Sequence, residues 1–273
     1  MKKLIGFALI AIGLLFCGCE KVIDVQLNTA PPRLVIDAAI QWTKGTTGNN
    51  QRIKLSTTTS YFSTTIPPVS GATVFIMDSN SSVFDFIENT ETGEYFCGNF
   101  TPVLNGVYTL TVIYKNQTYT ATEILKRAPA IDFIEQKNDG GFTGKDKEIK
   151  AFFTDDAATE DYYLFKFRPS TSAFPAYNVA ADKFFQGNQI FSIYTSKDLK
   201  SGDHLEINSF GVSERYYNYI NILISIAGTS SGSPFQSPPS TVRGNVINAT
   251  NAANYPLGFF SLSESDYKDY IVQ

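Results

Sequence analysis

The sequence contains little histidine, little cysteine and no excess of positive charge, and each shortage excludes a class of protein. Its 273 residues include one His, three Cys and 22 Lys+Arg against 26 Asp+Glu, so the formal net charge is −4 and the pI is near 5.1. Nucleic-acid binders need a basic surface that releases counterions, so we expect no DNA or RNA partner. The single imidazole, at His204, excludes a two-His metal site within one chain and leaves one imidazole base.

The N-terminus has the pattern of a lipoprotein signal peptide. Two lysines precede an apolar stretch at residues 4–16, which is shorter than the roughly 20 residues of a membrane-spanning helix. Gly18 stands directly before Cys19, an arrangement that resembles the lipobox cleaved after diacylation of the cysteine sulfur. We predict that residues 1–18 are removed and that Cys19 carries two or three acyl chains, which anchor stably. An ordinary secretory peptide with incidental cysteines is the alternative.

The remaining cysteine is expected to have a structural role. After Cys19 only Cys97 is left, so the mature chain can form no intramolecular disulfide. Cys97 ends a short strand-like stretch without a basic neighbour that would lower its pKa. We therefore expect it to be a small buried apolar side chain.

Hydrophobic residues of period two predict a mainly β protein. The first half contains predicted strands at 33–42, 51–61, 72–77, 83–87, 93–97, 107–114 and 117–126. Lys115-Asn116 forms a tight hairpin between the last two. We interpret residues 33–127 as an immunoglobulin-like (transthyretin-like) β-sandwich. Residues 19–32 form a lipid-anchored tether before it, and a boundary follows near Pro129.

Residues 128–273 are predicted to form a second β-rich domain with one amphipathic helix at 213–228. Its strands are predicted at 131–134, 148–153, 162–168, 189–194 and 204–210. In the helix, apolar residues recur at helical spacing between Ser213, an expected N-cap, and Gly228, an expected stop. A stripe of this width normally packs on a sheet, with partner docking as the alternative.

A short acidic segment is the candidate metal site of the chain. Asp155, Asp156, Glu160 and Asp161 place four carboxylates within seven residues, and Ca²⁺ prefers such oxygen ligands. The glycine and terminal glutamate of an EF-hand are absent, so we favour a solvated turn and keep calcium as the alternative. Sequence alone selects no carboxylate pair for glycoside hydrolysis.

We predict no catalytic residue, no cofactor and no metal beyond this calcium alternative. His204 has only Asp203 and Glu206 as acidic neighbours in sequence, and strand geometry turns Asp203 to the opposite face. A Gly-x-Ser-x-Gly elbow, which would supply an activated serine, is missing. His204 is therefore expected at a surface or strand edge.

The candidate partner-binding residues are Phe235, Pro238, Pro239 and Arg243. Prolines around Phe235 restrict the backbone, so less conformational entropy is lost when the aromatic ring docks. Arg243-Gly244-Asn245 fits a structural turn equally well. In that turn Gly244 would adopt a positive φ and Asn245 would bond the backbone.

Several segments occur in the same order as similar segments in one known family. They are Ile23-Asp24-Val25, Leu34-Val35-Ile36-Asp37, and the runs at 69–74, 92–95, 106–110, 153–156, 238–246 and 257–261. This order resembles a widespread family of Bacteroidota outer-membrane lipoproteins known only as a domain of unknown function. Glu20, directly after Cys19, resembles the surface-export signal of such lipoproteins. The resemblance implies a lipoprotein encoded beside TonB-dependent receptors, and it supplies no catalytic residues.

We therefore expect a lipid-anchored protein of the outer membrane, at the cell surface or on the periplasmic face. Its expected partners are membrane lipid, through Cys19, and a TonB-dependent receptor. The expected role is that of a non-catalytic accessory or binding subunit in nutrient uptake. A free-standing glycan-binding or adhesin-type lipoprotein and a carboxylate-dependent surface hydrolase are the two alternatives.

Overall fold

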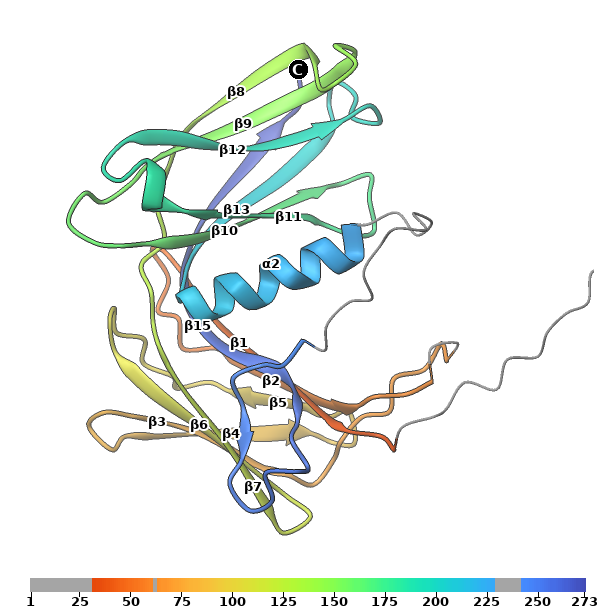
Figure 1. Ribbon diagram of the computed structural model, residues 1–273, viewed down its shortest axis with the longest axis vertical. Helices are drawn as coiled ribbons and strands as arrows, with labels where there is room; N and C mark the ends of the chain where they lie inside the picture. The colour runs from red at the N-terminus through yellow and green to blue at the C-terminus, as the bar shows by residue number, and fades with distance from the viewer. Residues whose placement is uncertain (1–30, 61–62, 229–241) are drawn as a thin grey trace, which may run out of the picture. The chain divides into compact units, whose positions relative to one another are not determined.

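The computed structural model describes residues 31–60, 63–228 and 242–273, and these residues form a mainly β protein (Figure 1). Within this part of the chain the α-helix is α2 (Glu214–Gly228), so the expected mainly β fold with one helix in its second half is confirmed. The strands are β1 (Leu34–Thr43), β2 (Gln51–Thr57), β3 (Thr73–Asp78), β4 (Val83–Asn89), β5 (Glu94–Cys97), β6 (Val107–Tyr114), β7 (Gln117–Ile124), β8 (Ile131–Gly140), β9 (Asp146–Thr154), β10 (Tyr162–Pro169), β11 (Ala176–Ala181), β12 (Gln189–Ser196), β13 (His204–Val212), β14 (Ile247–Asn248) and β15 (Leu257–Ile271).

The first half folds into a β-sandwich with its own core, as expected for an immunoglobulin-like fold. Strands β1, β2 and β5 pair in one sheet, and β3, β6 and β7 pair in the other. β4 joins the two sheets because its first residues pair with β3 and its last residues with β5. The alternation that predicted these strands follows from this arrangement, in which every second side chain enters the core. Cys97 is buried there, 3% exposed.

The hairpin between β6 and β7 has the predicted tight turn. Lys115 and Asn116 have φ values of +49° and +58°, and Tyr114 pairs directly with Gln117. Two consecutive positive φ angles define a type I′ turn, whose twist matches that of the flanking strands. Asn tolerates this conformation better than most residues.

A second core lies between the three-stranded sheet β12-β9-β8 and strands β10 and β13 of the larger sheet. Ile149, Ala151 and Phe153 alternate along the inner face of β9 and pack in the same cluster as Phe165 and Ile207. Each of the five side chains is completely buried. This half therefore has a hydrophobic core separate from that of the first sandwich.

The long strand β15 belongs to both halves of the described chain (Figure 1). Its residues 257–265 pair in parallel with β1, and residues 265–271 pair antiparallel with β13. Phe260 and Leu262 of this strand lie in the first core, together with Val246. The division at residues 127 and 128 stays a prediction, but the end of the chain contributes side chains to the core of the first half.

Helix α2 has the predicted N-cap and packs on the larger sheet. The Oγ of Ser213 accepts a hydrogen bond from the backbone N of Tyr216 at 3.2 Å, which satisfies one free N–H of the first turn. The rings of Tyr216 and Tyr219 lie 5.0 and 4.8 Å from the ring of Phe259 on β15. Apolar side chains nearer the C-terminal end are more exposed, including Ile222 at 40%.

Candidate functional site

Two of the four predicted acidic side chains point inward at the junction of β9 and β10. Asp155 follows β9 directly and is 5% exposed. Its Oδ1 accepts a hydrogen bond from the Tyr163 hydroxyl, and its Oδ2 accepts one from the backbone N of Gly187 at 2.7 Å. Asp161 precedes β10, half-buried, and accepts a hydrogen bond from the Thr159 hydroxyl.

The other two acidic side chains are exposed and make local hydrogen bonds. The Oδ1 of Asp156 accepts a bond from the backbone N of Ala158 at 3.0 Å, which is the pattern of an Asx turn. The Oε1 of Glu160 accepts a bond from the Tyr162 hydroxyl at 2.9 Å. The structure therefore does not bring all four carboxylates together.

A third carboxylate, which is buried, completes the inward cluster and comes from a later part of the chain. Asp182 begins the short 3-10 helix η1 (Asp182–Phe184) and is 1% exposed. Its Oδ2 accepts a hydrogen bond from the backbone N of Asp161 at 2.7 Å. One ligand oxygen from each of Asp155, Asp161 and Asp182 lies within 4.8 Å of the others. A single Ca²⁺ ion, which binds oxygens at about 2.3–2.6 Å, could bridge such a set.

Burial and mutual repulsion shape the electrostatics of this acidic cluster. Desolvation raises the pKa of Asp182, and the nearby carboxylates of Asp155, Asp161 and Glu160 raise it further, although the bond from Asp161 N opposes the shift. Burial and the hydrogen bond to Asp155 raise the pKa of Tyr163 far above its ordinary value. Full ionisation of the three carboxylates is thus unfavourable, and a bound cation would reduce the repulsion between them. Calcium binding itself stays the alternative interpretation of this acidic segment.

We expect Asp182→Asn to stabilise the metal-free protein at pH 7 by about 1 kcal/mol. The Asn side chain keeps an oxygen that accepts the bond from Asp161 N, and it removes a buried charge. The pKa of Asp182 is higher in the folded protein than in the unfolded chain. Its carboxyl group therefore contributes fully to the free energy of unfolding below the unfolded-state pKa, and this contribution is lost as the pH rises through the folded-state pKa. The advantage of the variant should therefore disappear on acidification toward pH ~4.

Thermal unfolding in EDTA at pH 7 and near pH 4 measures this effect, with Asp156→Asn as the matched control. Asp156 is exposed and outside the cluster, so its variant should unfold as the wild type does. Added Ca²⁺ separates the two interpretations of the cluster. An ion bound by the three carboxylates raises the midpoint of the wild type and not that of Asp182→Asn. A variant less stable than wild type in EDTA would contradict the electrostatic account.

A pocket of about 600 Å³ opens beside the acidic cluster and is lined by both acidic and basic side chains. Asp155, Asp156, Glu160 and Asp161 contribute acidic groups, and Lys44, Lys126 and Arg127 contribute basic ones. The Nζ of Lys44 donates a hydrogen bond to the Ala128 carbonyl at 2.8 Å, so this cation also holds the chain between the two cores. Such a pocket suits a hydrophilic ligand better than an apolar one.

Most of the predicted anchoring and partner-binding residues lie outside the described residues. This applies to Cys19, Phe235, Pro238 and Pro239. Arg243 is described and is exposed, with its guanidinium carbon 4.0 Å from the centroid of the Tyr255 ring. Arg33 lies at the same distance from that ring, so Arg243 has an aromatic partner within the chain itself.

The two residues after Arg243 have structural roles. The side chain of Asn245 bonds the Phe260 backbone in both directions, accepting from its N at 2.9 Å and donating to its carbonyl at 2.8 Å. This part of the turn prediction is confirmed. Gly244 is required for close approach and not for a positive φ, because a Cβ there would lie 1.5 Å from the Gly258 carbonyl oxygen.

His204 is exposed at the start of β13, as expected, but it has an acidic partner from another strand. Its Nδ1 lies 2.9 Å from the Oδ2 of Asp269 on β15. Neither Asp203 nor Glu206, the acids beside it in sequence, provides this contact. Strand pairing between β13 and β15 brings the two side chains together, which local sequence does not reveal.

The fold and the buried carboxylate cluster define a mainly β protein with a candidate cation site. The chain belongs to the family described as "Domain of unknown function (DUF4249)", whose model matches residues 20–269. No curated protein matches the sequence. Solved structures similar to this chain include a segment of two fibronectin type III domains from chicken tenascin (10% identity, 66% of this chain and 90% of that chain, TM-score 0.22). A cytokine receptor complex also matches (8% identity, 67% and 92% covered, TM-score 0.27).

Proposed function

We propose that this protein is a lipid-anchored lipoprotein of the bacterial outer membrane that serves as a non-catalytic binding subunit beside a TonB-dependent receptor. The observation that carries the proposal is the start of the family match at residue 20, directly after Cys19. The family region and the segment after the expected cleavage site thus begin within one residue of each other. In the described residues, no helix is long and apolar enough to cross a membrane.

The anchor would make a weak contact with a transporter productive. Acyl chains on Cys19 confine the protein to the plane of the membrane, which raises its effective concentration near a receptor in the same membrane. The two β cores then present pockets and loops to cargo or to the receptor. No covalent step is needed for such a role.

Co-purification from cross-linked membranes tests the partner. We expect the tagged protein to recover a β-barrel receptor in stoichiometric amount, and another lipoprotein of the same membrane, tagged in the same way, to recover none. Recovery of the protein as a monomer from membranes that were cross-linked efficiently would contradict the accessory role. It would leave the free-standing surface lipoprotein as the better description.

A further inference from the structure

A groove of about 420 Å³ lies between helix α2 and the face of the larger sheet. Its apolar lining comes from Leu164 and Phe210 on the sheet and from Ile220, Leu223 and Ile224 on the helix. This volume lies within the range of small-ligand sites, which combine an apolar lining with a few polar groups. The groove is separate from the acidic cluster, with which it shares no lining residue.

Two groups of opposite charge line the groove without a hydrogen-bond or ion-pair partner among the described residues. Asp37 on β1 and Lys166 on β10 make no side-chain hydrogen bond or ion pair with any residue in the described part of the chain. The side-chain amide of Gln41, two residues beyond Ala39 and four beyond Asp37 on β1, likewise makes no hydrogen bond within those residues. The groove thus offers one anionic group, one cationic group and one amide around an apolar lining.

Tyr177 and Tyr216 line the groove, and the ring of Tyr219 stacks on that of Tyr216 with 6.3 Å between the centroids. Burial raises the pKa of Tyr177, Tyr216 and Tyr219, and the negative charge of Asp37 raises each of them further, with Tyr216 reaching about 12. Asp37 and two of these tyrosines, Tyr177 and Tyr216, line the same groove. Aromatic faces and a carboxylate together attract an ammonium group. At neutral pH the phenols stay protonated and do not add negative charge.

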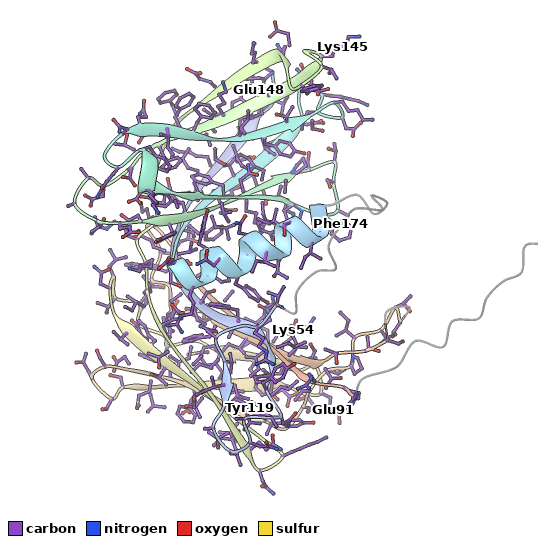
Figure 2. The ribbon with its side chains drawn as sticks, viewed as in Figure 1. Lys54, Glu91, Tyr119, Lys145, Glu148 and Phe174 are labelled. Carbon is purple, nitrogen blue, oxygen red and sulfur yellow. The ribbon has the colours of Figure 1, made fainter. Side chains whose placement is uncertain are left out.

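One other cation stands near Asp37 and must be considered. Lys54 on β2, labelled in Figure 2, is the cross-strand partner of Asp37. Its Nζ forms no ion pair with that carboxylate within 4.0 Å in the described structure. The carboxylate therefore stays available to a ligand, and removal of Lys54 should strengthen ammonium binding at Asp37.

We propose that the groove under α2 binds a short zwitterionic peptide with apolar side chains. The N-terminal ammonium binds Asp37 beside the tyrosines, and the C-terminal carboxylate binds Lys166. The apolar side chains contact the lining from α2, β10 and β13, and the Gln41 amide bonds the peptide backbone. The claim that such a peptide is the cargo of an uptake system rests on the proposed function. The claim that the groove binds a peptide does not.

Calorimetric titration of the purified full chain with trileucine tests the proposal. We expect saturable binding that weakens about tenfold in Asp37→Asn and in Lys166→Met, because each variant removes one charge-assisted contact. Asp85→Asn and Lys145→Met are the matched controls. Both side chains are exposed and line none of the pockets described above, and Figure 2 shows Lys145 at the hairpin between β8 and β9. Both controls should bind as the wild type does.

Blocked peptides assign each end of the ligand. The wild type should bind N-acetyl-trileucine about tenfold more weakly than it binds trileucine. The Asp37→Asn variant should bind the two peptides with equal affinity. The C-terminal amide should show the same relation to Lys166→Met. The proposal is wrong if trileucine does not bind the folded wild type, if either variant binds it unchanged, or if blocking an end weakens binding to the matching variant as much as to the wild type.

The outcome is independent of the co-purification experiment. Trileucine binding without a co-purified receptor would retain the peptide groove and reject the accessory role. A co-purified receptor without trileucine binding would retain the accessory role and reject the peptide groove.

Discussion

Replacing Cys19 by Ala is expected to move nearly all of the protein from the membrane fraction to the soluble fraction. Each acyl methylene buried in a bilayer contributes about 0.8 kcal/mol, so two or three chains hold a protein stably where one does not. Alanine has no sulfur to accept the diacylglyceryl group, and the variant would lose the entire anchor. Membrane fractionation with immunoblotting, together with metabolic labelling by a radioactive fatty acid, measures both consequences.

Cys17→Ala is the matched control for the anchor. Cys17 lies two residues before Cys19 but follows Phe16, which is too large for the position before a lipidated cysteine. We expect this variant to stay in the membrane and to keep its label. A Cys19→Ala protein that still incorporates fatty acid, or a Cys17→Ala protein that loses it, would show that the lipid is attached elsewhere.

Local patterns predicted the parts of the fold whose side chains alternate between core and solvent. Strand β1 alternates cleanly, with Ile36, Ala38 and Ile40 buried at 0–1% exposure. The β6–β7 hairpin and the start of α2 were predicted for equally local reasons, namely the turn residues at 115–116 and the cap at Ser213. These features depend on neighbours in sequence, so one sequence suffices to find them.

Strand β15 escaped prediction because both of its faces are covered along residues 259–265. Ser263, Glu264 and Ser265 are each at most 6% exposed, so polar side chains occupy buried positions and the period-two signal is lost. The Oε2 of Glu264 accepts a hydrogen bond from the backbone N of Ala128 at 3.0 Å, which satisfies part of this buried carboxylate. The strand is specified by its partners β1 and β13, which sequence does not place beside it.

The candidate cation site was predicted only in its local part. Asp155 and Asp161 flank one turn, whereas Asp182 reaches them through the β10–β11 pairing. Strand β11 gave no clear alternation, since most of its residues are half-buried. The two charged residues that line the groove under α2 have the same origin. Asp37 and Lys166 are far apart in sequence and line one pocket only after the sheet coils under the helix.

Gly258→Ala is expected to destabilise the protein by about 4 kcal/mol, among the largest effects of a single substitution. Gly258 pairs with Ile36 where β15 first joins β1, and it has a φ of +93°. A Cβ built at this position lies 2.0 Å from the Ile36 carbonyl oxygen, a backbone atom that cannot move without opening the pairing of the two strands. Because β15 links both cores, the damage would reach both. The midpoint of thermal unfolding should fall by about 10 °C.

Gly45→Ala separates this steric effect from backbone strain. Gly45 has a similar φ of +81°, but a Cβ there meets nothing within 4 Å. The control should therefore lose only about 1 kcal/mol, from the unfavourable conformation alone. Equal losses in the two variants would mean that φ strain accounts for the whole effect and that the close contact of β15 with β1 is unimportant for stability. A several-fold larger loss in Gly258→Ala would identify that contact as the constraint that requires glycine, and would make the β1–β15 pairing the element on which both cores depend.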